Sequence, residues 1–269
     1  MNGVNLEIAP CEDAHSSRFI YKAIFWLCDT TFSAQRVVFV KNSCRGFAAL
    51  FFLVSVSVAI AADSQCYGTV SNGRIEGSVK LPASGTNFVS YSRLANSLGR
   101  TYVHNKVADV VVAAYGSLAK NHPTVTYVYG ETGLAAGDRF RPHRTHQNGL
   151  SVDFFVPVRD ASGNSVPLPT SVTKRFGYDV EFDATAKYGE YTIDFPAIAE
   201  HLYQLDVAAK ARGIGIALVI FDTDYLPRLL ATPRGNYLQK NLPFMKGRPW
   251  VRHDEHDHVD FAVPCKRLG

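Results

Sequence analysis

The sequence has little of the charge, repetition or low complexity that would point to a fibrous, disordered or nucleic-acid-binding protein. Charged residues make up 19% of the 269 residues, and the formal net charge is only +4. The basic residues are scattered rather than gathered into one stripe, so nucleic acid is not expected as a partner. Because no internal repeat is present and aromatic residues reach 12%, we expect one globular domain in the mature chain.

An apolar segment near the amino end predicts export. The short basic stretch at residues 41–45 is followed by an apolar run that ends in the small residues Ala59 and Ala61. This order predicts a secretory signal peptide over residues 41–61 with cleavage after Ala61, so the mature protein is expected to be periplasmic or otherwise exported. The run is also just long enough to span a bilayer, which makes an uncleaved anchor the alternative.

Methionine is scarce, which bears on where translation starts. It occurs only at positions 1 and 245. Since a signal peptide stands at the start of a protein, we expect residues 1–40 to be a wrongly assigned upstream extension, with a true start at another codon at Val37, Val38 or Val40. The domain then covers residues 62–269, and no stable membrane insertion is expected after cleavage.

Cysteine is scarce in the part of the chain that is expected to be mature. Three of the five cysteines precede residue 62, which leaves Cys66 and Cys265 at the two ends of the domain. An even number of cysteines in an exported protein suggests a disulfide. Free thiols or a lipid-modified Cys66 are the alternatives, although a lipid-modified cysteine would directly follow the cleavage site and residues 62–65 intervene here.

Histidine and aspartate occur in two separate apolar runs. Near the end of the chain, His256 and His258 are separated by one residue, so an extended backbone directs both imidazoles to the same face. Earlier, His146 precedes the apolar run 150–156, which contains Asp153. A carboxylate inside an apolar run is costly to bury unless it is paired or bound to a metal. The two clusters are therefore candidates for one shared site.

These residue types match the ligands of a catalytic zinc site, which has three protein ligands and an open position for water. His146, Asp153 and one of the two late histidines would complete that set. The other late histidine would act as general base or as a donor to the oxyanion, since its ordinary pKa lies near neutral pH. A single histidine beside a turn is more often a surface or core residue, but two such clusters favour a metal site and a peptide or amide hydrolase.

Three segments of the chain carry a family resemblance. They are SNGRIEGSVKLP, GLAAGDRFRPHRTHQNGLSVDFF, and RPWVRHDEHDHV with a nearby PC. In these segments the sequence resembles the penicillin-insensitive murein endopeptidases, a branch of the LAS metallopeptidases, over roughly residues 66–265. The resemblance implies one zinc ion per chain, with the ligands His146, Asp153 and His258. It further implies His256 as the catalytic base and places His143 and His253 in the cleft as accessory residues.

The activity of that family sets the expected substrate. Its members cleave peptide cross-links between the stem peptides of bacterial peptidoglycan, typically the D-alanyl to meso-diaminopimelyl bond. They need no serine nucleophile, which explains their insensitivity to penicillin. The resemblance therefore implies an exported zinc endopeptidase whose partners are peptidoglycan stem peptides.

Glu255 is a second candidate for the general base. It stands three residues before His258, the spacing at which the dipeptidase relatives place a glutamate base. Because neighbouring strand residues face opposite ways, we do not expect both Glu255 and His256 to reach the water, and we favour His256. With Glu255 as base, the protein would be a zinc D,D-carboxypeptidase or dipeptidase that trims stem peptides. A Hedgehog-like domain that keeps zinc for structure and binds partners is the non-catalytic alternative.

Apolar periodicity predicts the fold class. Helical periods predict two long helices, over 107–120 and 195–212. Apolar runs predict strands over 124–129, 150–158, 215–221 and 256–263, and alternation predicts a hairpin over 176–193. This order favours an α+β fold with a small, mostly antiparallel central sheet, flanking helices and long cleft-forming loops, as the family resemblance also implies.

One loop is expected to carry part of the site. Residues 133–147 are rich in Gly, Arg, Pro and His and are expected to deliver His143 and His146 to the cleft. Arg139, Arg141 and Arg144 in this loop are candidates for binding substrate carboxylates, although exposed arginines are more often only solvated.

Overall fold

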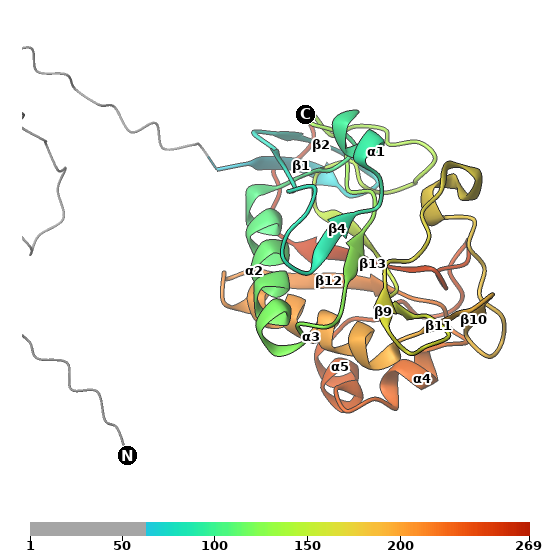
Figure 1. The fold of residues 1–269 in the computed structure, drawn as a ribbon. Coiled ribbons are helices and arrows are strands. Elements are labelled where there is room, and N and C mark those ends of the chain that lie inside the picture. The colour runs from blue at the N-terminus through green and yellow to red at the C-terminus, as the bar shows by residue number, and fades with distance from the viewer. Residues whose placement is uncertain (1–62) are drawn as a thin grey trace, which may run out of the picture. The chain divides into compact units, whose positions relative to one another are not determined.

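The computed structural model describes residues 63–269, and the fold below refers to this part of the chain (Figure 1). The expected upstream extension, residues 1–40, and the expected signal peptide, residues 41–61, lie outside it. Within residues 63–269, no helix is both long and apolar enough to cross a membrane.

A five-stranded sheet is the centre of the fold. Its strands lie in the order β12-β13-β7-β6-β4, and all neighbours are antiparallel except β4 and β6. The predicted α+β class with a small, mostly antiparallel sheet is thereby confirmed. The strands are β4 (Phe88–Ser90), β6 (Tyr127–Tyr129), β7 (Ser151–Phe155), β12 (Gly215–Ile220) and β13 (His256–Ala262).

Two long helices cover one face of this sheet. They are α2 (Asn105–Asn121) and α3 (Phe195–Lys210), so both predicted helices are confirmed to within about one turn. Asp194 begins α3, because its side chain accepts a hydrogen bond from the backbone amide of Ala197. Tyr115 of α2 and His201 of α3 both contact the ring of Phe154 in β7, with centroids 6.4 and 4.6 Å away. The two helices therefore pack on the face of β7 that carries Phe154.

The predicted strand over 150–158 is shorter than expected. It ends at Phe155, and a separate strand begins at Val158. Pro157 lies in the break, where it has no backbone N–H to give to a sheet. Beyond it, a four-stranded sheet in the order β10-β11-β8-β9 forms one side of the molecule. Its strands are β8 (Val158–Arg159), β9 (Ser165–Val166), β10 (Lys187–Tyr188) and β11 (Tyr191–Ile193).

The remaining elements are short. The predicted hairpin over 176–193 is present only in its second half, as β10 and β11, and a 3-10 segment, η1 (Val172–Gly177), precedes it. Two small two-stranded sheets lie near the amino end of the domain, β1 with β2 and β3 with β5. The bounds are β1 (Gln65–Thr69), β2 (Asn72–Glu76), β3 (Val79–Lys80), β5 (Tyr102–Val103), α1 (Arg93–Ser97), α4 (Leu226–Leu230) and α5 (Gly235–Asn241).

A disulfide joins the two ends of the domain. Cys66 in β1 and Cys265 after β13 are bonded, at a sequence separation of 199 residues, which confirms the expected pair. Backbone hydrogen bonds continue this junction, since the amide of Lys266 donates to the carbonyl of Cys66 at 3.0 Å. Loop closure of this length stabilises a fold by at most about 5 kcal/mol in the chain-entropy model.

Candidate metal centre

Sheet register brings the two histidine clusters together. β13 pairs with β7 so that His258 lies opposite Asp153, and His256 lies opposite Phe155. Directly opposed residues on antiparallel strands share a face, and residues two apart along a strand do so as well. His256, His258 and Asp153 therefore project from the same face of the sheet, opposite to the face that α2 and α3 cover.

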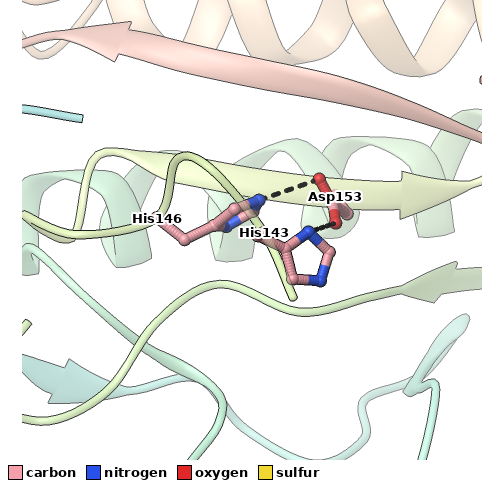
Figure 2. A group of neighbouring side chains, drawn as sticks. All are labelled: His143, His146 and Asp153. Carbon is pink, nitrogen blue, oxygen red and sulfur yellow. Dashed lines mark ion pairs between the residues drawn. The ribbon is translucent and has the colours of Figure 1, made fainter. Parts of the chain in front are cut away.

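Asp153 is at the middle of the cluster and is fully buried. Its Oδ1 atom lies 2.8 Å from Nδ1 of His258, 3.2 Å from Nε2 of His146 and 3.9 Å from Nε2 of His256. Its Oδ2 atom lies 3.8 Å from Nδ1 of His143. Figure 2 shows His143 and His146 directed at the two oxygens of this carboxylate. The structure therefore brings together all the residues that the sequence proposed as ligands.

His146 supplies a buried nitrogen that has no hydrogen-bond partner in the described part of the chain, residues 63–269. Its Nδ1 lies 3.1 Å from the carbonyl oxygen of Thr132, which can only accept, so Nδ1 carries the proton. Nε2 is therefore a bare lone pair that faces Asp153, and it makes no hydrogen bond. The backbone of His146 has φ 68°, the left-handed region that is uncommon for a residue other than glycine. Burial lowers the pKa of His146, which keeps the imidazole neutral.

This donor set fits a divalent metal ion. Imidazole nitrogens and a carboxylate oxygen are zinc ligands, and a metal-binding histidine typically donates its other ring N–H to a carbonyl, as His146 does. Ligand atoms of His143, His146 and Asp153 all lie within 4.8 Å of one another, close enough to hold one ion. The lone pair on Nε2 of His146 faces a lone pair on Oδ1 of Asp153, and no proton lies between them. A bound cation would accept both lone pairs.

Asp260 is a site residue that the sequence reasoning missed. Its Oδ1 lies 2.9 Å from Nε2 of His258 and accepts a hydrogen bond from the hydroxyl of Ser151. His258 is thus held between two carboxylates, Asp153 at Nδ1 and Asp260 at Nε2. Burial alone would lower the pKa of His258, but Asp260 and Asp153 raise it to about 10. Strand alternation could have found Asp260, because it lies two residues beyond His258 on the same face of β13.

Glu255 and His256 contact each other, although strand alternation would direct neighbouring side chains to opposite faces. That only one of the two reaches the water stays a prediction. Glu255 lies in a bend just before β13 begins, where alternation does not apply. Nδ1 of His256 lies 2.9 Å from Oε1 of Glu255, and both side chains line the same cleft. Burial raises the pKa of Glu255 to about 8 and lowers that of His256 to about 4. Nε2 of His256 remains directed towards Asp153, with Glu255 on the far side of the ring.

The centre lies at the floor of an open cleft of about 920 Å³. His143 and His253 both line it, as the family resemblance implied, and the His253 ring lies 4.7 Å from that of His256. Burial lowers the pKa of His253 to about 4. The cleft rim carries exposed apolar side chains, including Trp250, which is 45% exposed.

Arginines surround the mouth of the cleft. Three of them are ion-paired within the chain: Arg100 with Glu131, Arg175 with Asp179, and Arg252 with Asp254. Arg141 and Arg144 also line the cleft, and within residues 63–269 neither forms an ion pair. Arg139 lies outside this lining and faces a neighbouring pocket instead.

An α+β domain with a buried carboxylate, several imidazoles and an open cleft has the features of a metal-dependent hydrolase. Comparison with known sequences shows which family the chain resembles. The sequence model of the family described as penicillin-insensitive murein endopeptidase matches residues 66–175. The chain is therefore related to this family, and the resemblance inferred from its motifs is confirmed.

Curated relatives bear the same name. A penicillin-insensitive murein endopeptidase of Klebsiella pneumoniae (strain 342) is 26% identical over 216 residues, which cover 79% of this chain and 72% of that protein. Those of Escherichia coli O157:H7 (strain EC4115 / EHEC) and Shigella dysenteriae serotype 1 (strain Sd197) are 24% identical over 238 residues, or 82% of this chain and 78% of theirs. The family match includes His143, His146 and Asp153 but ends before β13, so the structure is what joins both halves of the site.

Proposed function

We propose that this protein is an exported zinc endopeptidase that hydrolyses peptide cross-links of bacterial peptidoglycan, of the D-alanyl to meso-diaminopimelyl type. The observation that carries the proposal is the convergence of the bare Nε2 of His146 and Nδ1 of His258 on Oδ1 of Asp153. This convergence lies beneath an open cleft. The names of the curated relatives support the substrate class.

His146, Asp153 and His258 would hold the zinc ion, in place of the proton that lies between Nδ1 of His258 and Oδ1 of Asp153 in the metal-free protein. When bound, zinc polarises the scissile carbonyl and lowers the pKa of a water molecule towards neutrality. Nε2 of His256 faces this position and is the group that would accept the proton of the attacking water. Glu255 bonds to the opposite nitrogen of His256 and fixes the orientation of the ring. The ring of His253 lies beside that of His256, and its Nδ1 donates to the carbonyl of Val251, so its Nε2 would accept a hydrogen bond from substrate or water.

The rim of the cleft supports a carboxylate-bearing peptide as substrate. Arg141 and Arg144 have no anionic partner within residues 63–269, so their guanidinium groups are free to pair with carboxylates of a ligand. Stem peptides carry several, including the second carboxylate of diaminopimelate. The guanidinium of Arg144 lies 5.6 Å from the ring centre of Trp250, so a cationic and an apolar contact stand side by side.

The geometry favours His256 over Glu255 as base. Glu255 contacts the Nδ1 edge of His256, and the ring lies between that carboxyl group and Asp153. A trimming carboxypeptidase or dipeptidase with Glu255 as base remains the alternative enzyme, and a zinc-stabilised binding domain the non-catalytic one. Their products differ from those of an endopeptidase, so product analysis separates the three.

The test uses defined muropeptides and mass spectrometry. The zinc-loaded protein is incubated with cross-linked dimers and, separately, with monomeric pentapeptides. An endopeptidase converts the dimers into monomers, stops on addition of a zinc chelator and resumes when zinc is restored. Release of terminal D-alanine from pentapeptides, with dimers intact, would show the trimming enzyme instead. Full zinc occupancy without any product would show the binding domain.

A further inference from the structure

A buried carboxylate, Glu131, stands behind the candidate metal centre and has no part in the mechanism above. It follows β6 and is 6% exposed. We propose that Glu131 is a positioning residue: its carboxylate orients His143 towards Asp153, and its backbone amide, through Tyr178, orients Asp153 itself. This inference deepens the proposed function and rests on it for the metal-binding readout only.

The carboxylate of Glu131 determines which nitrogen of His143 carries the proton. Nε2 of His143 lies 2.5 Å from Oε2 of Glu131. Because an ionised carboxylate can only accept, Nε2 must be the donor, and Nδ1 of a neutral ring is then a lone pair. That lone pair lies 3.8 Å from Oδ2 of Asp153. Glu131 therefore turns the accepting side of the imidazole towards the centre, which is the function of an outer carboxylate at a metal site.

Two further groups fix the carboxylate of Glu131 in place. Oε1 accepts a hydrogen bond from the hydroxyl of Tyr91 at 2.7 Å, and the guanidinium of Arg100 donates to both oxygens, at 3.0 Å to Oε2. Arg100 also lies 4.2 Å above the ring of Phe140 and donates to the carbonyl of Arg141. The ionised carboxylate is thus fully hydrogen-bonded and tied to the loop that carries His143.

A second connection leads from the same residue to Asp153. The amide of Glu131 donates to the hydroxyl of Tyr178 at 3.0 Å, and that hydroxyl donates to Oδ2 of Asp153 at 2.8 Å. The amide thereby makes the hydroxyl hydrogen point at the carboxylate. With Oδ2 held in this way, Oδ1 is the oxygen directed at His146 and His258. Residue 131 consequently orients one imidazole through its side chain and one carboxylate through its backbone.

The substitution Glu131→Gln tests the side-chain connection with little change in shape. A glutamine amide can donate as well as accept, so it no longer requires the proton to sit on Nε2 of His143. In the metal-free protein, ring-nitrogen NMR shifts should report the Nε2–H tautomer for wild-type His143 and a mixed or reversed tautomer for the variant. His143 lies with His146 and Asp153 in a group whose ligand atoms are close enough to hold one ion, so we also expect zinc affinity, measured by competition with a chelator, to fall about 10-fold to 100-fold.

Glu200→Gln is the matched control. Glu200 is another buried glutamate that accepts from an arginine, Arg234 at 2.6 Å, but it lies on α3. It should leave zinc affinity and the His143 tautomer unchanged. A double-mutant cycle on kcat adds a readout that a merely structural effect would not move: Glu131→Gln should change kcat little when His143→Ala is already present.

The outcomes separate this inference from the proposed function. An Nδ1–H tautomer of His143 in the wild-type protein would overturn the role of Glu131, whatever the protein binds. So would Glu131→Gln and Glu200→Gln having equal effects on zinc affinity, or fully additive effects of Glu131→Gln and His143→Ala on kcat. A wild-type protein that shows the Nε2–H tautomer but binds no zinc would refute the proposed function and leave the orientation of His143 standing.

Discussion

The two faces of strands β7 and β13 differ sharply although both are buried. On one face the cross-strand pairs are polar: Ser151 with Asp260, and Asp153 with His258. On the other face Val152 pairs with Val259 and Phe154 with Asp257, and α2 and α3 cover this face. The same backbone ladder therefore supports a core on one side and a candidate metal centre on the other.

One buried histidine on each face shows what distinguishes them. His258 is 3% exposed and His201 is 2% exposed, so desolvation acts on both. His201 packs among aromatic rings and has no charged partner within residues 63–269, and burial lowers its pKa to about 3. Burial also opposes the charge on His258, yet two carboxylates raise its pKa to about 10. The carboxylate partners of a buried histidine, rather than its burial, therefore determine whether positive charge is favoured at that position.

The largest effect is expected from removing a ligand on the polar face. His146→Ala deletes the bare nitrogen that faces Asp153, so zinc affinity should fall by more than the ~100-fold typical of losing an outer hydrogen-bond partner. Turnover of cross-linked muropeptides should be lost with it, because the activated water depends on the metal. Zinc content by atomic spectroscopy and product analysis measure both. His122→Ala, at a side chain that is 42% exposed, is the control and should keep full zinc and activity.

The next largest effect should come from His256. His256→Ala removes the proposed general base but none of the proposed ligands, so kcat should fall by ~10²-fold to 10⁴-fold while bound zinc is retained. Glu255→Gln should have a smaller effect, since its contact with His256 only orients the ring. Steady-state kinetics with zinc determined on the same samples measure this. A larger loss for Glu255→Gln than for His256→Ala would assign the base to Glu255.

Much of this comparison could be predicted from the sequence. The long helices and the strands β7, β12 and β13 have strong periodicity. Residue type and spacing together made His146, Asp153, His256 and His258 candidates for one site, and the family resemblance assigned their roles. The short hairpin of β1 and β2 was missed, because its strands, QCYGT and NGRIE, contain few apolar residues and so lack the apolar run that marks β7.

The outer contacts of the site could not be predicted in the same way. Glu131 and Tyr178 come from segments far apart in the chain, and only the fold brings their side chains to His143 and Asp153. Neither residue stands at a recognisable spacing from a ligand. Asp260 differs, because its distance of two residues from His258 was available in the sequence.

An acid titration sharpens the contrast on the apolar side. Between its folded pKa of about 3 and the ordinary value of 6.5, His201 binds a proton only in the unfolded chain. Its contribution to stability is therefore complete above about pH 6.5 and lost as the pH falls, by about 1.4 kcal/mol per pH unit. His201→Leu should make the loss of unfolding free energy between about pH 7 and pH 5 smaller by about 2 kcal/mol. Urea unfolding measures it, and parallel pH profiles of both proteins would contradict it.

Two aspartates on one strand should differ in their effect on zinc binding. Asp260 contacts His258 on the polar face, whereas Asp257 points to the other face, where burial raises its pKa well above the ordinary value. Asp260→Asn should weaken zinc binding by ~10-fold to 100-fold, because His258 loses the carboxylate that orients its ring. Asp257→Asn replaces a carboxyl group with an amide of the same shape on the face away from the proposed ligands and should leave zinc affinity unchanged. If chelator competition gives equal losses of zinc affinity for both variants, the affinity depends on the strand as a whole rather than on the contact at Nε2 of His258.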